Sequence, residues 1–475
     1  MDKLLVSNQG RRDAARGIRQ LSLPDFGQIL ADAGIYRAYI LYENGQFQLS
    51  HPKILAPLQA FLELSQDFAE HEGIFLGRED GLDSVFWAFV HDTRRGLAQG
   101  GLRFAPYASL ADVLVDGMRL SQGMTRKNAL AGLNWGGGKG IMTLPGSYSH
   151  PSQFGAGPER QAYFEAYGRF VASLGGIYYT AEDVGTSTAD MAAILSQNRF
   201  TTCIPANYGG SGNPSPYTAR GVLRAMQAAW QALSGSDSLL GVKVSVQGTG
   251  NVGGPLIRYL DDVGAEVYVA DVNLASLDAL LAERPRLHAV TDPGAIFDVD
   301  ADIFAPCAIG AQVNVDTIPR LKVRLVCGAA NNILREPEAD AERLRARGIG
   351  FVPDFVANRM GIVNCADEWQ GYLADDVRLA AERVFPDTLR VFKYARSRYS
   401  TTTQAANDLA DMAASELHPL LGHRGRRIID DLLASHWSEY HPHLPQVVKK
   451  IAGDPAFGPA LDEPPQRVRW EREGL

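Results

Sequence analysis

A glycine-rich turn between a strand-like run and a helix-like run is the feature that most constrains this chain. Residues 242–246 (VKVSV) are typical of a buried strand, and the string GTGNVG at 248–253 opens a segment with helical apolar spacing. In this context the first glycine permits a tight turn, the second lets a pyrophosphate approach the backbone, and the third lets the helix pack closely. The helix N-terminus adds free N–H groups for phosphates. The sequence therefore predicts a dinucleotide-binding unit, with cofactor contacts at Gly248, Gly250, Asn251, Val252 and Gly253.

The residue after the next strand indicates which cofactor fits. A strand expected at 266–270 is followed by Asp271, and no Arg or Lys comes closely after it (DVNLAS). A carboxylate there accepts hydrogen bonds from the adenosine ribose and repels a 2′-phosphate. The sequence thus predicts NAD rather than NADP. The alternative is a structural strand–turn–helix with an acidic loop residue.

Composition excludes several other classes of protein. The 475 residues suffice for two large domains or three average ones, and 46 Lys and Arg against 54 Asp and Glu give a net charge of −8. A general nucleic-acid binder carries a basic excess instead. No apolar run approaches the ~18 residues of a membrane span, and the first residues lack a signal-peptide pattern. Four cysteines without a CxxC pair argue against a metal site or a disulfide framework. We therefore expect a cytoplasmic globular chain with no metal, membrane or nucleic-acid partner.

The order of the segments predicts an α/β fold. From 241 to 352 strands alternate with helices, which favours a parallel sheet with right-handed crossovers. Before this region, the pattern predicts a buried strand at 85–90, a helix at 108–131 and a glycine-rich break at 136–140. Beyond 354 the chain is mostly helical to about 417.

Two lysines and one aspartate are candidates for chemistry. Lys139 is flanked by four glycines (GGGKG), which let backbone approach a ligand, and Lys127 lies twelve residues before it. Two ammonium groups held together in a partly dry site would lower the pKa of one of them and make it a neutral base. Asp183 follows a strand end, where loop residues often carry function. The alternatives are two solvated lysines, and a helix cap or surface group at Asp183.

Eight strings in unbroken order resemble the amino acid dehydrogenase family, the glutamate/leucine/phenylalanine/valine dehydrogenases, and above all its leucine branch. They cover roughly residues 75–417, about 70% of the chain. Such a long ordered set is specific for the family and less specific for the substrate. The strings are HDTRRGLAQGGLRF (91–104), GMTRKNALAGLNWGGGKG (123–140), YYTAEDVGTSTADM (178–191), GGSGNPSPYTARGV (209–222), VQGTGNVGG (246–254), DIFAPCAIGAQVN (302–314), GAANNIL (328–334) and FVPDFVANRMGIVNCADE (351–368).

The resemblance implies a role for each matching position. Lys139 is similar to the family's catalytic lysine, and Lys127 to the lysine that binds the substrate α-carboxylate. Asp183 is similar to the acidic residue that exchanges protons with the substrate amine. Further matches are to residues that line the substrate or cofactor site: Gly100, Gly101, Thr218, Ala308 and Asn332.

Family members separate acidic from apolar substrates largely at two positions. Where glutamate-type enzymes carry Lys and leucine-type enzymes Leu, this chain has Gln99. At the second position, glutamate-type enzymes carry Ser and leucine-type enzymes Val. This chain has Cys365 there, with Ile362 and Ala181 beside it. A neutral amide cannot neutralise a γ-carboxylate, so the resemblance implies an apolar or aromatic substrate side chain. A buried amide needs partners, which leaves two alternatives open: a substrate with a polar tip, or a Gln99 that turns away to pair with backbone.

One string departs from the family pattern. NRMG at 358–361 stands where NAGG is usual, so that Arg359 and Met360 replace small residues. Their bulk is expected to narrow the pocket, to alter the cofactor fit, or to mark a specialised or inactive member.

The resemblance also implies two domains around a cleft: an α/β substrate and oligomerisation domain, and a Rossmann dinucleotide-binding domain. We expect residues 75–215 to form the first, 216–357 the second, and helices in 358–417 to return to the first. Residues 1–74 are expected to pack on the substrate domain as an extension, and 418–475 to form a second extension. Both would help to set a homo-oligomer.

The implied activity is reversible, NAD-dependent oxidative deamination of an L-amino acid to a 2-oxo acid and ammonium. In this hypothesis Lys127 binds the carboxylate, neutral Lys139 activates the attacking water, and Asp183 relays protons. The alternative is a catalytically silent homologue, in which NAD or amino acid occupancy regulates a partner through the terminal extensions.

Overall fold

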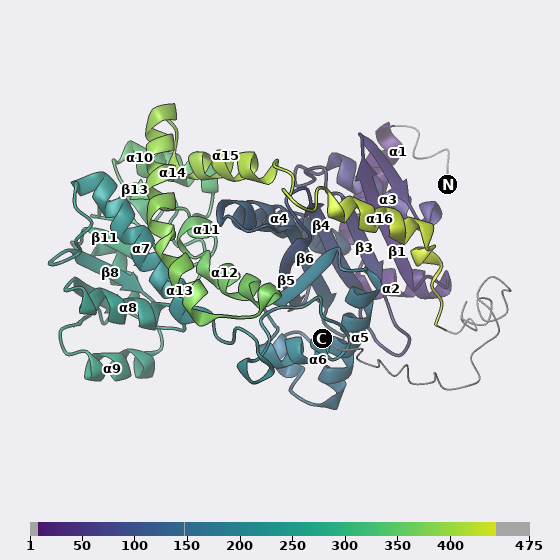
Figure 1. Ribbon diagram of the computed structural model, residues 1–475, viewed down its shortest axis with the longest axis horizontal. Helices are drawn as coiled ribbons and strands as arrows, with labels where there is room; N and C mark the ends of the chain where they lie inside the picture. The colour runs from purple at the N-terminus through teal and green to yellow at the C-terminus, as the bar shows by residue number, and fades with distance from the viewer. Residues whose placement is uncertain (1–7, 147, 443–475) are drawn as a thin grey trace, which may run out of the picture.

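The computed structural model describes residues 8–146 and 148–442, which form two α/β units (Figure 1). Each unit is built on one β-sheet, and helices pack on both faces of each sheet. The second sheet is entirely parallel, as the alternation of strands and helices predicts. The two-domain α/β fold class is therefore confirmed.

The first unit contains β1 (Arg37–Glu43), β2 (Gln46–Leu49), β3 (Gly73–Gly77), β4 (Phe86–Asp92), β5 (Ala98–Ala105), β6 (Gly136–Thr143) and β7 (Tyr178–Glu182), with α1 (Asn8–Gln20), α2 (Leu23–Asp32), α3 (Pro52–Leu64), α4 (Leu110–Leu130), α5 (Pro158–Ser173), α6 (Thr188–Leu195) and α16 (Arg424–Ala434). The strand order is β2-β1-β3-β4-β6-β5-β7, and β5 runs parallel to both β6 and β7. On β4, Trp87 and Phe89 face α1–α4, whereas Phe86 and Ala88 face α5, α6 and α16. This alternation gives the sheet one apolar core on each side.

The second unit contains β8 (Lys243–Gln247), β9 (Glu266–Ala270), β10 (His288–Ala289), β11 (Ile303–Pro306), β12 (Leu325–Val326) and β13 (Gly350–Phe351), with α7 (Ser215–Ser234), α8 (Gly253–Asp262), α9 (Leu274–Glu283), α10 (Pro337–Ala346), α11 (Asp354–Ala357), α12 (Met360–Ala366), α13 (Ala374–Glu382), α14 (Val384–Arg398) and α15 (Thr402–Ala414). Its strand order is β10-β9-β8-β11-β12-β13. The larger apolar core of this unit lies on one face of the sheet, under α7, α8 and α13–α15. A smaller apolar core on the other face includes side chains of α10. Among the described helices, none is long and apolar enough to cross a membrane.

The N-terminal residues are part of the first sheet rather than an extension packed on it. Strands β1, β2 and β3 continue the sheet beyond β4, and the expected boundary at 74/75 falls inside β3. Ile40 and Ile74 share a core with Trp87 of β4 and with Leu114 of α4. The structure therefore corrects the prediction of a separate N-terminal extension, because these strands bury apolar side chains in the same core as β4 and α4.

The helices after residue 358 pack mainly on the second unit, but Cys365 of α12 lies in the core of the first unit and Asp411 of α15 pairs with Arg126 of α4, so the expected return at 358–417 is made in part. Val377, Val391 and Leu409, from α13, α14 and α15, lie in the same core as Val244 of β8. The return is completed by residues 418–442. There Ile429 of α16 packs in the core of the first unit. The rest of the expected C-terminal extension, 443–475, lies outside the described residues.

A small polar cluster fixes the returning segment to the first sheet. The Glu72 carboxylate accepts hydrogen bonds from the backbone N–H of Thr93 at 2.8 Å and contacts Nε2 of His423 at 3.1 Å. Thr93 is fully buried, and a Cβ on Gly425 would come within 2.1 Å of its hydroxyl. Residues 423–425 therefore pack closely against Glu72 and Thr93 of the first unit.

Replacing His423 by Gln is expected to cost stability only at lower pH. The hydrogen bond to Glu72 raises the pKa of His423 above its usual 6.5, and burial opposes that rise. The extra stability is therefore complete below pH 6.5 and is lost as the pH rises through the higher folded-state pKa. Because the pair is part-exposed, we expect up to about 1 kcal/mol. The check is the thermal midpoint of both proteins at about pH 6 and about pH 9. His288→Gln, beside Glu266 on the surface, is the control; equal losses at both pH values would contradict the prediction.

Candidate active site

Glycines make β6 thin enough for helix and strand to approach it from both faces. A Cβ on Gly137 would lie 2.0 Å from the Thr125 hydroxyl of α4. On the opposite face, a Cβ on Gly138 would lie 2.7 Å from the ring of Tyr178, and one on Gly140 would lie 2.3 Å from the Tyr167 hydroxyl. The glycine cluster is therefore an extended strand, which corrects the expected glycine-rich break and nest around Lys139.

Lys139 lies on this strand and forms an ion pair with Asp183, which follows β7. Only 4% of Lys139 is exposed. Burial lowers the pKa of the Lys139 amine, and Asp183 opposes that shift. Burial would raise the pKa of Asp183, but the Lys139 and Arg103 cations outweigh it and lower this pKa to about 2. The carboxylate thus stays ionised, and the amine is the partner whose proton is easier to remove.

Lys127 comes from the last turns of α4 and faces the second unit. Its Nζ donates to Oδ1 of Asn358 at 3.0 Å, and Asn358 in turn donates to Oδ1 of Asn331 at 2.8 Å. Burial lowers the pKa of Lys127, whereas Asp354 and Asp183 raise it. An ammonium group has three donors, and within the described residues only the one to Asn358 is used. Two donors remain for a ligand carboxylate.

The two predicted substrate glycines lie where strand and loop meet most closely. A Cβ on Gly100 would come within 1.7 Å of the Gly138 carbonyl oxygen, and one on Gly101 within 2.7 Å of the Asp183 Cβ. The carbonyl of Gly100 accepts a hydrogen bond from the Tyr178 hydroxyl at 2.6 Å. A side chain at either position would therefore displace the Lys139–Asp183 pair.

The predicted side-chain pocket residues are all buried around α12. Gln99 on β5 pairs laterally with Tyr179 of β7, and Gly101 with Ala181. Cys365 of α12 shares a core with Ala181, and its sulfur lies 2.6 Å from that of Cys203. Ile362 is buried one turn before Cys365. Only 2% of Gln99 is exposed, and its Oε1 has no hydrogen-bond partner among the described residues, so this oxygen does not pair with backbone.

The two bulky residues of the NRMG string make contacts with helices. Arg359 is fully buried; it donates to the carbonyl of Leu130 at 3.2 Å and pairs with Asp387 of α14. Met360 packs against Gly221 of α7. Their bulk therefore fills a junction between helices, and these contacts are with helices rather than with the expected substrate pocket. Arg359 joins the end of α4 to the second unit.

The glycine-rich turn has the geometry that its spacing predicts. Gly248 has a φ of 103°, and a Cβ on Gly253 would lie 2.1 Å from the Gly248 carbonyl oxygen. A Cβ on Gly250 would meet nothing within 4 Å, so the backbone is open to a ligand there. The N-terminus of α8 begins at this turn, and Val252 provides no side-chain cap. Asn251 lies between these residues in the turn.

Asp271 lies at the end of β9 and holds the turn in place. It accepts hydrogen bonds from the Thr249 N–H at 2.6 Å and from the Asn273 N–H at 2.7 Å. Burial would raise the pKa of Asp271, but these N–H donors outweigh it and lower that pKa. The carboxylate is part-exposed, and Val272 beside it is 86% exposed.

The remaining predicted cofactor residues border the same region from other elements. The N–H of Ala308 would lie 3.1 Å from a Cβ on Gly248. Asn332 has a φ of 50°, and its N–H donates to the Asp354 carboxylate. Thr218 lies on α7, 3.3 Å from where a Cβ on Gly361 would be. Ala308 thus borders the glycine-rich turn, Asn332 lies on the loop that contacts Asn358, and Thr218 faces the start of α12.

Three residues without an assigned role in the sequence analysis complete the site. Arg103 donates to Asp183 at 3.1 Å, Asp354 lies close enough to Lys127 to raise its pKa, and Asn358 binds Lys127 directly. All three lie inside strings that resemble the family, so the signal was present in GGLRF and FVPDFVAN. The strings do not show which residues of different helices and strands contact each other.

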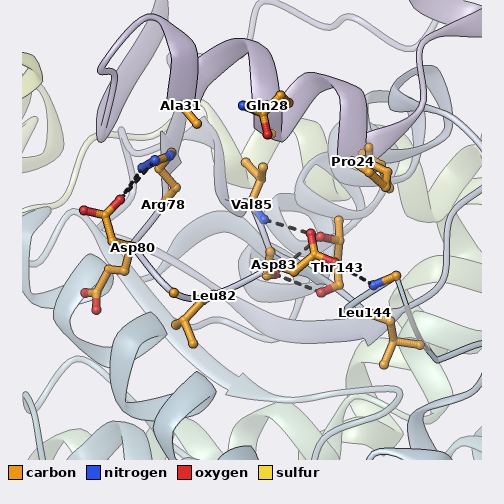
Figure 2. Close-up of a pocket in the computed structure, with 16 residues that line it drawn as sticks. Pro24, Gln28, Ala31, Arg78, Asp80, Leu82, Asp83, Val85, Thr143 and Leu144 are labelled. Atoms are coloured by element: carbon orange, nitrogen blue, oxygen red, sulfur yellow. Dashed lines mark hydrogen bonds and ion pairs between the residues drawn. The ribbon is translucent and has the colours of Figure 1, made fainter.

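A separate surface pocket of about 180 Å³ lies at the far end of β6, between α2 and the loop before β4 (Figure 2). Pro24 and Gln28 line it from the helix, and Asp83 and Thr143 from the sheet side. None of the residues that line it was predicted as a site residue. It plays no part in the arrangement around Lys139.

Replacing Gly137 by Ala is expected to destabilise the protein by about 1–3 kcal/mol, because the added methyl group forces α4 away from β6. Gly123→Ala is the matched control: Gly123 lies in α4 itself, where a Cβ meets nothing within 4 Å, so this change should not destabilise the helix. Chemical unfolding measures both, and an equal effect of the two substitutions would refute the packing argument.

Comparison with known proteins shows the family of this chain. The model of the Glu/Leu/Phe/Val dehydrogenase dimerisation domain matches residues 77–200, and that of the glutamate/leucine/phenylalanine/valine dehydrogenases matches 272–406. Leucine dehydrogenase of Geobacillus stearothermophilus is 42% identical over 334 residues, which are 70% of this chain and 87% of the relative. Valine dehydrogenase of Streptomyces coelicolor is 39% identical over 356 residues, 74% of this chain and 94% of the relative.

Solved structures show the same fold. L-tryptophan dehydrogenase from Nostoc punctiforme has a TM-score of 0.64 at 31% identity, over 75% of this chain and 97% of that one. Hetero-hexameric glutamate dehydrogenase from Thermus thermophilus, at 21% identity, has a TM-score of 0.58, over 80% of this chain and 87% of that one, and supports the fold alone. With a leucine dehydrogenase this similar along 87% of its length, and with both family models matched, the chain belongs to the glutamate/leucine/phenylalanine/valine dehydrogenases and is an amino acid dehydrogenase.

Proposed function

We propose that this protein catalyses the reversible, NAD-dependent oxidative deamination of an L-amino acid with an apolar or aromatic side chain. The observation that carries the proposal is the buried ion pair of Lys139 with Asp183. Lys127 lies close enough to Asp183 for the charge of that carboxylate to raise the pKa of Lys127. These groups provide an amine with a lowered pKa, an ionised carboxylate and an ammonium donor for a substrate carboxylate.

Each side chain has a task that its surroundings support. Lys127 binds the α-carboxylate with the donors that Asn358 leaves unused. Lys139, as a neutral amine, takes a proton from the water that attacks the imine carbon, and Asp183 carries a proton to the departing amine. The absence of side chains at Gly100 and Gly101 lets β6 and Asp183 lie directly against β5. Burial of both lysines keeps bulk water from competing for these protons.

The residues of the second unit fit a nicotinamide dinucleotide. The open backbone at Gly250 and the uncapped start of α8 would receive its pyrophosphate, and Asp271 its adenosine ribose. Ala308, Thr218 and Asn332 would border the nicotinamide half. When bound, the cofactor supplies the acceptor for the substrate hydride. Asp271 and the absence of a nearby cation in DVNLAS support NAD over NADP.

The buried side chains predicted to surround the substrate side chain support an uncharged substrate. Ala181, Ile362 and Cys365 are apolar and buried, and Gln99 offers a neutral amide where a γ-carboxylate would need a cation. The orphan Oε1 of Gln99 also favours substrates with a hydrogen-bond donor near the tip. The similar proteins named for leucine, valine and tryptophan fall within this range. We further propose a homo-oligomer, in line with the dimerisation domain that matches residues 77–200.

The silent regulatory homologue gains no support from the described residues. The NRMG string and Gln99 are the two features that favour this alternative, and Arg359 and Met360 of that string pack on helices. It would act on a partner through terminal extensions, whereas residues 8–74 and 418–442 complete the first unit.

A scan of the twenty L-amino acids for NADH formation tests the proposed activity. We expect turnover with apolar or aromatic substrates and little with glutamate. Lys139→Ala should lower turnover by at least about 10³-fold, because it removes the base, while NAD binding measured by calorimetry stays intact. Lys53→Ala, an exposed lysine of α3, is the control. No turnover with any substrate, or near-normal activity of Lys139→Ala, would refute the proposal.

Replacing Asp271 by Ser tests the cofactor preference. The change removes the acceptor for the ribose and the charge that repels a 2′-phosphate, so the ratio of kcat/KM for NAD to that for NADP should fall about 10- to 100-fold. Steady-state kinetics with both cofactors measures this ratio. Asp278→Ser, at an exposed position of α9, should leave it unchanged. An unaltered ratio in Asp271→Ser would remove the basis for the NAD assignment.

A further inference from the structure

Arg103 links the catalytic carboxylate to a second, outer carboxylate. Its Nε donates to Oδ2 of Asp183 at 3.1 Å, the same oxygen that Lys139 contacts. Its Nη1 donates to both oxygens of Asp116 on α4, at 3.0 and 2.9 Å, and the Tyr107 hydroxyl donates to Asp116 at 2.6 Å. The guanidinium is thus held at two ends, and its position is fixed relative to Asp183.

The strand geometry explains why Arg103 reaches this oxygen. Gly101 and Arg103 are two residues apart on β5 and therefore face the same side of the sheet. Because Gly101 has no side chain, Asp183 can lie directly over the strand, with its Cβ 2.7 Å from where a Gly101 Cβ would be. The guanidinium then meets the carboxylate from one side and Lys139 meets it from the neighbouring strand.

Three charged groups act on the Lys139 amine, and they shift its pKa in opposite directions. Burial lowers the pKa of Lys139; Asp183 raises it, Arg103 lowers it and Asp116 raises it. The phenols nearby remain neutral, because burial raises their pKa values. The groups facing this site from the packed elements are Asp183 after β7, Arg103 on β5, Asp116 and Lys127 on α4, and the phenols of Tyr107 and Tyr178.

We propose that Arg103 is a positioning residue: it holds the Asp183 carboxylate in place and offsets its negative charge, so that Lys139 can give up its proton and act as the base. The proposal rests on the proposed function, since it concerns the same Lys139 and Asp183. Without Arg103, the full negative charge of Asp183 would act on Lys139 alone. Their direct ion pair would then stabilise the ammonium form of Lys139.

The proton balance of the step is simple. Lys139 enters as a neutral amine, and the water that attacks the imine carbon loses one O–H bond as a new N–H bond forms on Nζ. The resulting ammonium lies against Asp183, whose charge is shared with Arg103. Arg103 itself keeps its protons throughout, since a guanidinium does not titrate in this range.

The pH profile of kcat/KM for the amino acid substrate tests the proposal. Activity needs neutral Lys139, so the acidic limb of the profile reports its pKa. In Arg103→Gln the loss of a positive neighbour should move this limb to higher pH by about one unit, whereas Arg103→Lys should keep it near its original place. In Asp116→Asn the loss of a negative neighbour should move it to lower pH. An acidic limb that stays in place in both Arg103→Gln and Asp116→Asn, with only a uniform drop in kcat, would overturn the proposal.

Two controls separate this effect from misfolding and from failure of the proposed function. Arg169→Gln removes an arginine that pairs with Glu79 on the surface and should leave the profile unchanged. The second control is the pH dependence of Lys139 acylation by acetic anhydride, read by peptide mass spectrometry in the unliganded protein. It follows the amine without any turnover, and its midpoint should rise in Arg103→Gln. An unchanged midpoint overturns the role of Arg103 even if the enzyme is active, and a raised midpoint supports it even if the substrate has been misassigned.

Discussion

The close contact between α4 and β6 is the constraint on which the rest of the site depends. Gly137 lies so near Thr125 and the carbonyl of Ser121 that no side chain fits between helix and strand. The helix carries Asp116 and Lys127, and the strand carries Lys139. Charged groups that would otherwise be separated by a layer of side chains therefore share one site. The electrostatic interactions of that site follow from the contact rather than from any single ion pair.

Helix α12 performs the corresponding task for the second unit. Met360 and Val363 belong to the core around β8, whereas Cys365 belongs to the core of the first unit. Immediately before this helix, Asn358 binds Lys127 and Arg359 joins Leu130 to Asp387. One short segment thus connects Lys127, both cores and the loop that carries Asn332. A change in this segment alters both domains at once.

Local sequence predicted the elements well and the partners of their side chains poorly. The glycine-rich turn, the α4 helix and the strands of the parallel sheet come from spacing and periodicity, which act over a few residues. The glycine cluster around Lys139 was expected as a break, because glycine is frequent in turns, and is a strand whose glycines are required by contacts with Thr125 and Tyr178. Arg103 and Asn358 gain their roles from partners 80 and 231 residues away in sequence. No local pattern encodes such pairs.

The packing of α16 on the first sheet has a consequence for how the chain folds during its synthesis. Ile429, Trp437 and His423 complete a unit whose strands end at residue 182, and the whole second unit is synthesised in between. On the ribosome, the first sheet must wait with part of its apolar face uncovered until these last residues emerge, while the parallel sheet of the second unit can form beside it. The core of the first unit is therefore complete only once α16 has been synthesised, so that a chain cut short before α16 would present exposed apolar surface to the cell's chaperones.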